Sequence, residues 1–394
     1  MTSSLSQSLQ LTRHRRTLPA LTGVRFFAAF YVVLFHGLPW LRQRFVLPEA
    51  LQTFLGNGYL AVTLFFILSG FILAYTYDGQ IDGNTNRLHF WKARFARIYP
   101  VYFLSLVLAF WFERGLSFGT RTAVLLMVQT WNPRTPELTG AWNYPAWTLS
   151  VEAFFYLCFP FLLPWTSRRS GRTLFWIMGL MLAICVAVHT PIQGLGDLDR
   201  SSLLINIVPL PLLRIPEFLL GMVIGLKLLR NEAAGQNAGS PWKVYIAVLG
   251  ALLILSLPLG VWVSLVTIPF AVLVYELAIG GSVLAKFLSK SFMILLGSAS
   301  YAVYLLQFPV RSWARDFFSP SGKAGTSWNA THAPDLGSLF HFDFQIVGGT
   351  LPQSPSILVC VGKVTCGADS SFAIRRRSGG LVPHGRFDSF SRGV

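Results

Sequence analysis

The stretch VRFFAAFYVVLFHG, residues 24–37, reads as the middle of a membrane-spanning helix. It nevertheless carries Arg25 near one end and His36 near the other, and an ionisable side chain at bilayer depth costs about 3 kcal/mol or more. The two residues are eleven positions apart. This is close to a whole number of helical turns, so both project from one face, about 16 Å apart along the axis. Each could simply be paired within a helix bundle, but an Arg and a His on one apolar stripe favour a functional site.

The composition around this stretch is that of a membrane protein. Of the 394 residues, 53% are hydrophobic and only 12% are charged, whereas soluble chains carry about 25% charged residues. The apolar residues form long runs, which indicate transmembrane helices. The first seventeen residues are polar and basic, and no small-residue cleavage site follows the first apolar run. We therefore expect that run to remain as a signal anchor in the cell (cytoplasmic or inner) membrane.

The net charge of +16 would suggest nucleic acid as a partner in a soluble protein. Here the basic residues lie mostly in short segments between apolar runs, as the positive-inside rule requires. We therefore expect membrane lipids, and not nucleic acid, as partners. The four cysteines form no close pair, so their spacing excludes a disulfide framework and a zinc site, and we expect no bound metal.

The apolar runs predict an all-α fold, a polytopic transmembrane helix bundle of nine to ten spans. Basic residues next to the first, second and fourth spans fall on one side if 120–131 does not cross, and this places the N-terminus in the cytosol and Asp197 and Asp199 outside. The run 120–131 covers little more than half of the ~30 Å core, so it is either re-entrant or a partly buried surface helix. The nine spans are expected at 18–38, 57–77, 98–116, 147–165, 173–190, 205–226, 243–260, 261–281 and 292–312.

Three regions follow from these spans. Residues 1–17 form a basic cytosolic N-terminus, residues 18–312 form the membrane domain, and residues 313–394 form a low-complexity tail rich in Ser, Gly and Arg. Such a composition buries too little apolar surface to order itself. The tail is therefore either a disordered extension or the product of a shifted reading frame.

Several polar residues within or beside the spans are candidates for chemistry. Ser69 and Gly70 interrupt a run of large residues in the second span, either as a packing notch or as a substrate contact. Lys92, Arg94 and Arg97 precede the third span; they either anchor the helix to lipid headgroups or bind the phosphates of a nucleotide-bearing cofactor.

Other candidates lie in later spans. Glu152 lies about five residues into the fourth span beside Ser150. There it either forms a general-base pair with His36 or, if 120–131 crosses, lies near Arg25. Arg214 and Glu217 are spaced to pair along one helix. Packing accounts for the small residues and for one further polar face in the last span, formed by Tyr301, Tyr304 and Gln307.

Six motifs, in order, resemble the acyltransferase-3 family of multi-pass membrane acyltransferases, which includes O-antigen and exopolysaccharide O-acetylases. The resemblance covers about residues 18–310. The motifs are Arg25 and His36 with ten residues between them, LFFILSGF (64–71), RFARIYP (94–100), WTLSVEAFFYLCFP (147–160), RIPEFLLG (214–221) and LLGSASYAVYLLQFP (295–309). The resemblance implies transfer of an acyl group, usually acetyl, from acyl-CoA as co-substrate. The acceptor would be a sugar hydroxyl of a surface polysaccharide, a lipid-linked glycan or a glycosylated small molecule.

The resemblance also implies roles for matched residues. His36 would be the general base, with Glu152 and Arg25 beside it in catalysis. Acyl-CoA would contact Arg94, Arg97, Lys92, Ser69 and Gly70, and the acceptor would contact Ser150, Trp147 and Glu217.

The chain departs from the family in two ways. Ala153 stands where many members have a second acidic residue, and the last helix of the family is missing, so a truncated, inactive acyltransferase is one alternative. A transporter or flippase of a glycan or lipid-linked sugar would use the same charges but predicts internal repeats, of which none is evident. A receptor or scaffold does not account for Arg25 and His36 on one face.

Overall fold

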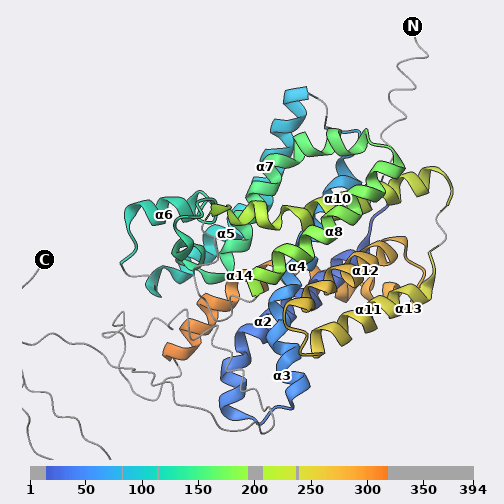
Figure 1. The fold of residues 1–394 in the computed structure, drawn as a ribbon. Helices are drawn as coiled ribbons and strands as arrows, with labels where there is room; N and C mark the ends of the chain where they lie inside the picture. The colour runs from blue at the N-terminus through green and yellow to red at the C-terminus, as the bar shows by residue number, and fades with distance from the viewer. Residues whose placement is uncertain (1–14, 82, 113–114, 194–206, 237–238, 318–394) are drawn as a thin grey trace, which may run out of the picture. The chain divides into compact units, whose positions relative to one another are not determined.

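The computed structural model describes residues 15–81, 83–112, 115–193, 207–236 and 239–317, and every structural statement below concerns these residues. Within them all regular elements are helices, as predicted (Figure 1). The long helices are α2 (Pro19–Arg44), α4 (Ala61–Tyr77), α5 (Gly83–Ala109), α7 (Trp147–Ser167), α8 (Gly171–Gln193), α10 (Leu210–Ala233), α11 (Pro241–Ser256), α12 (Thr267–Ile279) and α14 (Ser291–Phe317). Shorter helices are α3 (Glu49–Gly56), α6 (Phe118–Leu125), α13 (Val283–Leu288) and the 3₁₀ turns η1 (Asn57–Leu60), η2 (Phe110–Phe112), η3 (Pro136–Gly140), η4 (Tyr144–Ala146) and η6 (Gly260–Val266).

Each predicted span overlaps one of the long helices. Six stretches of the described chain are long and apolar enough to cross a membrane: Pro19–Arg44, Glu49–Tyr77, Gly83–Phe112, Tyr144–Ser167, Trp262–Ile279 and Ser291–Arg315. Gly171–Ala187 and Pro241–Ser256 are shorter apolar helices, and α10 carries several charged residues. The predictions for residues 1–14, for Asp197 and Asp199 and for the tail from 318 onward lie outside the described residues.

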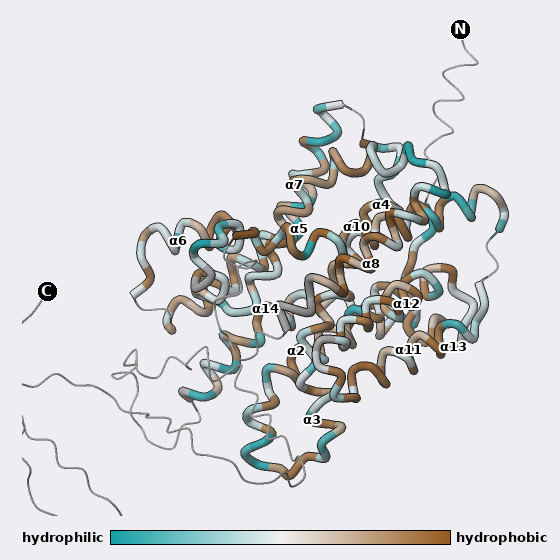
Figure 2. Tube along the Cα trace, viewed as in Figure 1, coloured by the Kyte–Doolittle hydropathy of each residue, from teal (hydrophilic) through white to brown (hydrophobic). Residues whose placement is uncertain are grey.

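The exposed surfaces of the helices are apolar, as a lipid-facing surface should be. Figure 2 shows hydrophobic residues along the helices and hydrophilic residues gathered near helix ends and connections. Phe30 on α2, Val107 on α5, Trp176 on α8 and Leu249 on α11 are each about half exposed. Large apolar side chains exposed on helix after helix are unusual for a soluble monomer, so the helices are suited to a bilayer.

The third predicted span, 98–116, begins within a longer helix. α5 begins at Gly83, so the basic motif of Lys92, Arg94 and Arg97 lies in the part of the helix that precedes the span. Basic side chains lower the local hydropathy but do not break a helix, because their long aliphatic stems reach along it toward water. The start of an apolar run therefore does not mark the start of the helix.

The first and last described helices, α2 and α14, run in the same direction and pack together. Gly297 approaches Thr22 so closely that a Cβ on Gly297 would lie 1.9 Å from the Thr22 carbonyl oxygen. About four turns further along both helices, Arg311 Nη1 donates to the His36 carbonyl at 2.6 Å. The residue numbers of the contacts rise together along α2 and α14, so the two helices are parallel.

Pairs of contacts give the directions of the other long helices in the same way. α5 is parallel to α14, α10 is parallel to α4, α7 is antiparallel to α5, and α4 is antiparallel to α2. Arg230 at the end of α10 donates to carbonyls at the end of α7, where α8 begins. Successive long helices therefore alternate in direction between one end that holds Arg16 and another that holds His36. We call these the Arg16 end and the His36 end.

The segment around α6 begins and ends on the same side of the bundle. The end of α6 reaches the middle of α5, where the Tyr99 hydroxyl donates to the Leu125 carbonyl at 3.3 Å. The chain then turns at Met127, whose φ is 57°, and returns toward the His36 end. There Trp142 Nε1 donates to the Leu106 carbonyl at 2.9 Å. The arrangement is that of a re-entrant segment, one of the two alternatives left open by the sequence.

Two prolines inside helices free carbonyl groups that side chains of other segments satisfy. A proline has no N–H for the carbonyl four residues earlier, and membrane helices tolerate it where another donor is available. Pro160 frees the Tyr156 carbonyl, which accepts from Trp91 Nε1 at 3.0 Å. Pro309 likewise frees the Leu305 carbonyl, which accepts from Asn143 Nδ2 at 3.1 Å. These bonds tie α5 to α7, and the segment before η4 to α14.

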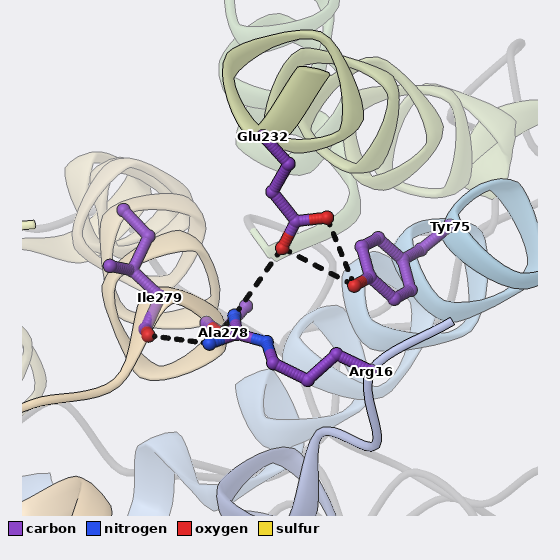
Figure 3. A network of polar contacts seen from close by, with 5 residues as sticks. All are labelled: Arg16, Tyr75, Glu232, Ala278 and Ile279. Atoms are coloured by element: carbon purple, nitrogen blue, oxygen red, sulfur yellow. Dashed lines mark hydrogen bonds and ion pairs between the residues drawn. The ribbon is translucent and has the colours of Figure 1, made fainter. Parts of the chain in front are cut away.

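Arg16 joins several elements at its own end of the bundle (Figure 3). Its guanidinium donates to the carbonyls of Ala278 and of Ile279, the latter at 3.1 Å, at the end of α12. It also lies 3.5 Å from the Glu232 carboxylate of α10, which accepts from the Tyr75 hydroxyl of α4 at 3.1 Å. The last carbonyls of a helix lack partners within it, and a cation satisfies them well. The segment before α2 is thus fastened to α4, α10 and α12.

Candidate active site

A cavity of about 460 Å³ lies between α2, α4, α5, α7 and α14. It brings together five of the predicted site residues, although they come from four different helices. These are Arg25, Ser69, Arg94, Arg97 and Glu152. The remainder of its lining is aromatic, aliphatic and hydroxyl-bearing, with Thr22, Phe66, Thr148, Tyr156, Tyr301 and Tyr304 among the residues.

Helical periodicity places the cavity-lining side chains of each helix on a single face of that helix. Arg94 and Arg97 are three residues apart on α5, and Glu152 and Tyr156 are four apart on α7, so each pair shares a face. Arg25 projects from the face of α2 that packs against α14. The polar residues of different spans therefore converge on one chamber, as binding sites of helix bundles do.

The Glu152 carboxylate is held by hydroxyl groups inside the cavity. Ser69 Oγ donates to Glu152 Oε1 at 3.0 Å, and the Tyr156 hydroxyl donates to the same oxygen. A buried carboxylate is costly unless hydrogen bonds or charges compensate it, and here two donors from α4 and α7 do so. Glu152 shares the cavity with Arg25, the partner that the sequence analysis connected with a crossing 120–131 segment.

The arginines of the cavity differ in how they are held. Arg94 Nη2 donates to the Tyr77 hydroxyl at 3.0 Å, and its guanidinium lies 5.8 Å from the centre of the Phe90 ring. Arg25 and Arg97 also line the cavity, and in the described part of the chain neither forms a hydrogen bond or an ion pair. Two guanidinium groups without protein partners are available to an anionic ligand, and phosphate oxygens match their geometry.

His36 lies outside this cavity, just beyond the end that is farther from Arg16. Its Nδ1 is 3.0 Å from Gln307 Oε1, and its ring meets that of Tyr144 edge-on at 5.8 Å between centroids. Gln307 follows the cavity residue Tyr304 by three positions, and Tyr144 precedes the cavity residue Thr148 by four. His36 is therefore about one helical turn, roughly 5 Å, past the cavity.

The predicted pairing of His36 with Glu152 is not what the structure forms. His36 bonds to Gln307, whereas Glu152 bonds to Ser69 and Tyr156. The prediction placed both residues at the same level because both lie near the same end of their spans. Tyr144, whose ring contacts His36, precedes Glu152 by about two helical turns, so the carboxylate lies inside the cavity and the imidazole outside it.

Five other predicted site residues lie away from the cavity lining. Lys92 is exposed on α5. Gly70 faces α10, where a Cβ would lie 1.9 Å from the Phe218 carbonyl oxygen. The buried Ser150 hydroxyl is 2.7 Å from Thr130 Oγ1, and Trp147 is half-buried at the start of α7.

Glu217 is buried between α10 and α4. Its Oε1 lies 3.3 Å from Arg214, which confirms the predicted pair along the helix, and it accepts from the Thr63 hydroxyl at 2.8 Å.

The structure adds residues that the sequence analysis assigned to packing or did not single out. Tyr156, Tyr301 and Tyr304 line the cavity, and Gln307 contacts His36. The signal was present in α14, because a three-residue spacing of polar groups on one face of an apolar span has a cost that packing alone does not require. The partners of these groups, however, come from helices far away in sequence.

Comparison with known proteins gives concordant matches. The model of the acyltransferase domain family matches residues 18–342. Acyltransferase MdmB of Streptomyces mycarofaciens is 29% identical over 356 residues, 85% of this chain and 89% of MdmB. O-acetyltransferase OatA of Staphylococcus aureus (strain NCTC 8325 / PS 47) is 24% identical over 341 residues, 77% of this chain and 52% of OatA, so the chain spans about half of that relative. No solved structure matches the chain.

Proposed function

The chain belongs to the acyltransferase domain family, and from this premise we propose that it is a membrane enzyme that transfers an acetyl group from acetyl-CoA to a sugar hydroxyl. The acceptor is a surface polysaccharide, a lipid-linked glycan or a glycosylated small molecule. One relative is named an O-acetyltransferase, which supports a hydroxyl as the acceptor group. The observation that carries the proposal is the pair of guanidinium groups without protein partners in a cavity that ends one helical turn from His36.

In this mechanism acyl-CoA enters from the Arg16 end and occupies the cavity. Arg25 and Arg97 bind its phosphates or its thioester carbonyl, and Arg94 supports them while held by Tyr77. A guanidinium forms paired hydrogen bonds with phosphate oxygens. The thioester carbonyl would then point toward the His36 end, where the acceptor binds.

His36 acts as the general base. A sugar hydroxyl is a poor nucleophile until a positioned base takes its proton. The hydroxyl oxygen attacks the thioester carbon, His36 takes the hydroxyl proton, the C–S bond breaks, and the proton passes to the CoA thiolate. Arg25 is the candidate donor for the oxyanion that forms on the way, because a fixed positive group near developing negative charge lowers the barrier.

We further propose nine crossings with the N-terminus in the cytosol of the cell. The alternating directions of the long helices and the return of the α6 segment support this topology. So does the distribution of basic residues, because those near the Arg16 end satisfy the positive-inside rule: Arg15, Arg16, Arg87, Arg168, Arg169, Lys227, Arg230, Lys286 and Lys290.

The test is transfer of radiolabel from acetyl-CoA into the glycolipid and polysaccharide fractions of membranes that hold the protein. Replacing His36 by Ala should lower the rate by about 10²- to 10⁴-fold, the usual contribution of a general base. His89→Ala is the matched control, since His89 is exposed on α5. Transfer unaffected by His36→Ala would contradict the proposed base. No CoA-dependent transfer by the wild type would favour a transporter or an inactive chain.

A further inference from the structure

The partner of His36 is an uncharged amide and not a carboxylate. Gln307 lies on the face of α14 that packs against α2, and its Oε1 is 3.0 Å from His36 Nδ1. In the described part of the chain, the charged or titratable groups next to His36 are Arg311 of α14 and Tyr144 of η4, with Tyr59 of η1 beside the adjacent Phe35. None of these is a carboxylate, so the hydrogen bond that Gln307 Oε1 accepts from the ring must orient it.

The orientation of the Gln307 amide is determined by its second contact. Gln307 Nε2 lies 2.8 Å from the Tyr304 carbonyl oxygen. A carbonyl can only accept, so the amide nitrogen must face Tyr304 and the amide oxygen must face His36. The amide oxygen in turn can only accept, so the imidazole nitrogen opposite it must carry a proton. The two bonds together require the tautomer of His36 with its proton on Nδ1.

We propose that Gln307 is a positioning residue that holds His36 in the Nδ1-protonated tautomer and so leaves Nε2 free to take the acceptor proton. The inference rests on the proposed role of His36 as base. A neutral imidazole has one donor and one acceptor nitrogen, and the bond made by one nitrogen decides the role of the other. In triads of Ser, His and Asp a carboxylate has the same orienting role and also stabilises the imidazolium. Gln307 supplies the orientation without the charge.

The backbone of His36 is held from the same face of α14. Arg311, one turn beyond Gln307, donates to the His36 carbonyl at 2.6 Å. Ring and backbone are therefore both positioned by α14. A shift of α14 along α2 would break both contacts together. The orientation of the His36 ring therefore depends on the position of α14 relative to α2.

The first test reads the tautomer directly and does not depend on activity. Protein labelled with ¹⁵N in the histidine imidazole is measured by NMR in detergent or bilayers, and the His36 signals are identified by their loss in His36→Ala. The wild type should have a protonated Nδ1 and an unprotonated Nε2 at neutral pH. Gln307→Leu should give a mixture of tautomers. A wild-type His36 with its proton on Nε2 would overturn the proposal even if the enzyme proved active.

The second test separates orientation from charge by kinetics. Gln307→Leu should lower kcat on the order of 10²-fold, because misorienting a catalytic group costs about that much, and should leave KM for acetyl-CoA nearly unchanged. Gln307→Glu keeps an acceptor oxygen and adds a charge that favours imidazolium. It should recover much of kcat at high pH and move the acid limb of the pH–kcat profile upward by about one unit.

Matched controls for both substitutions are Gln52→Leu and Gln52→Glu. Gln52 lies on α3, where its amide donates to the Leu47 carbonyl and not to His36. These variants should leave kcat and the pH profile unchanged. Equal losses in Gln307→Leu and Gln307→Glu, with no shift of the acid limb, would mean that Gln307 only supports packing and would overturn the inference.

Discussion

The guanidinium groups of Arg25 and Arg97 stand in the cavity without protein partners in the described chain. A charged side chain in the centre of a membrane helix costs about 3 kcal/mol, and this cost applies to the half-buried Arg25 more than to the exposed Arg97. Arg94, in contrast, is already bonded to Tyr77. The two unpartnered groups are thus the residues whose removal should affect ligand binding most.

Replacing Arg97 by Gln should raise KM for acetyl-CoA about 10- to 100-fold, because a hydrogen bond to a charged group is worth about 1.5–3 kcal/mol. Arg97→Lys should have an intermediate effect, since an ammonium keeps the charge but loses the two-pronged geometry. Initial rates across acetyl-CoA concentrations measure both. Arg87→Gln on the same helix, next to Asn84 and over the Phe161 ring, is the control. An unchanged KM would mean that Arg97 serves the lipid surface.

For single residues, the sequence predicted which side chains belong to the site better than it predicted which of them contact one another. Arg25, Arg94, Arg97 and Glu152 were recognised because charge in an apolar run is conspicuous, and all four line the cavity. The partner of His36 was assigned wrongly, because position along a span fixes the depth of a side chain only to within one or two turns. That uncertainty of about 5 to 11 Å exceeds the reach of a hydrogen bond.

The close crossing of α4 and α10 depends on small residues. A Cβ on Gly70 would lie 1.9 Å from the Phe218 carbonyl oxygen, and one on Gly221 would lie 2.0 Å from the Ile67 carbonyl oxygen. Small residues at helix crossings let backbones approach within a membrane. The geometry favours the packing interpretation of Gly70 over a contact with acyl-CoA.

Gly70→Ala should therefore lower the melting temperature of the detergent-solubilised protein, since forced overpacking costs about 1–3 kcal/mol. Gly179→Ala is the control on α8, where a Cβ would meet nothing within 4 Å. There the melting temperature should stay equal or rise slightly, because Ala favours helix over Gly by about 0.5–1 kcal/mol. A Gly70→Ala protein with normal stability but a raised KM for acetyl-CoA would instead place Gly70 in the donor site.

The existence of each long helix was easier to predict than the residues at which it begins and ends. Apolar runs located every long helix of the described chain, because burial in lipid demands such runs. The predicted span 98–116 gave no start for α5, which begins fifteen residues earlier at Gly83, since hydropathy detects the membrane core and not the helix that continues beyond it. The turn at Met127, with its positive φ, has no Gly or Pro to announce it, so the sequence left the course of the α6 segment open.

For the whole molecule, the proposed nine-span topology predicts that the two ends of the bundle lie on opposite sides of the membrane. Single cysteines in an otherwise cysteine-free background test this with a maleimide that does not cross membranes. Val46→Cys, in the exposed connection after α2, should react in intact cells. Ser170→Cys, between α7 and α8, should react only after lysis, and Gln80→Cys serves as a protected control.

If the α6 segment crossed, Ser170 would lie on the same side as Val46 and both cysteines would react in intact cells. That outcome would contradict the nine-span topology while leaving the N-terminal side unchanged. Labelling of the cysteine at Gln80 but not of that at Val46 in intact cells would instead indicate that the whole bundle has the opposite orientation. The three cysteine positions thus test separately whether the α6 segment crosses the membrane and on which side the N-terminus lies.

The parallel packing of α2 and α14 also bears on how the protein is made. His36 precedes its partner Gln307 by 271 positions, so it is synthesised long before that partner. Until α14 inserts, the face of α2 that bears the imidazole has neither its hydrogen-bond partner nor the neighbouring helix. With His36 as the proposed base, we expect a nascent chain to stay inactive until α14 has been made. A chain truncated before α14 should then show no acyl transfer, rather than a reduced rate.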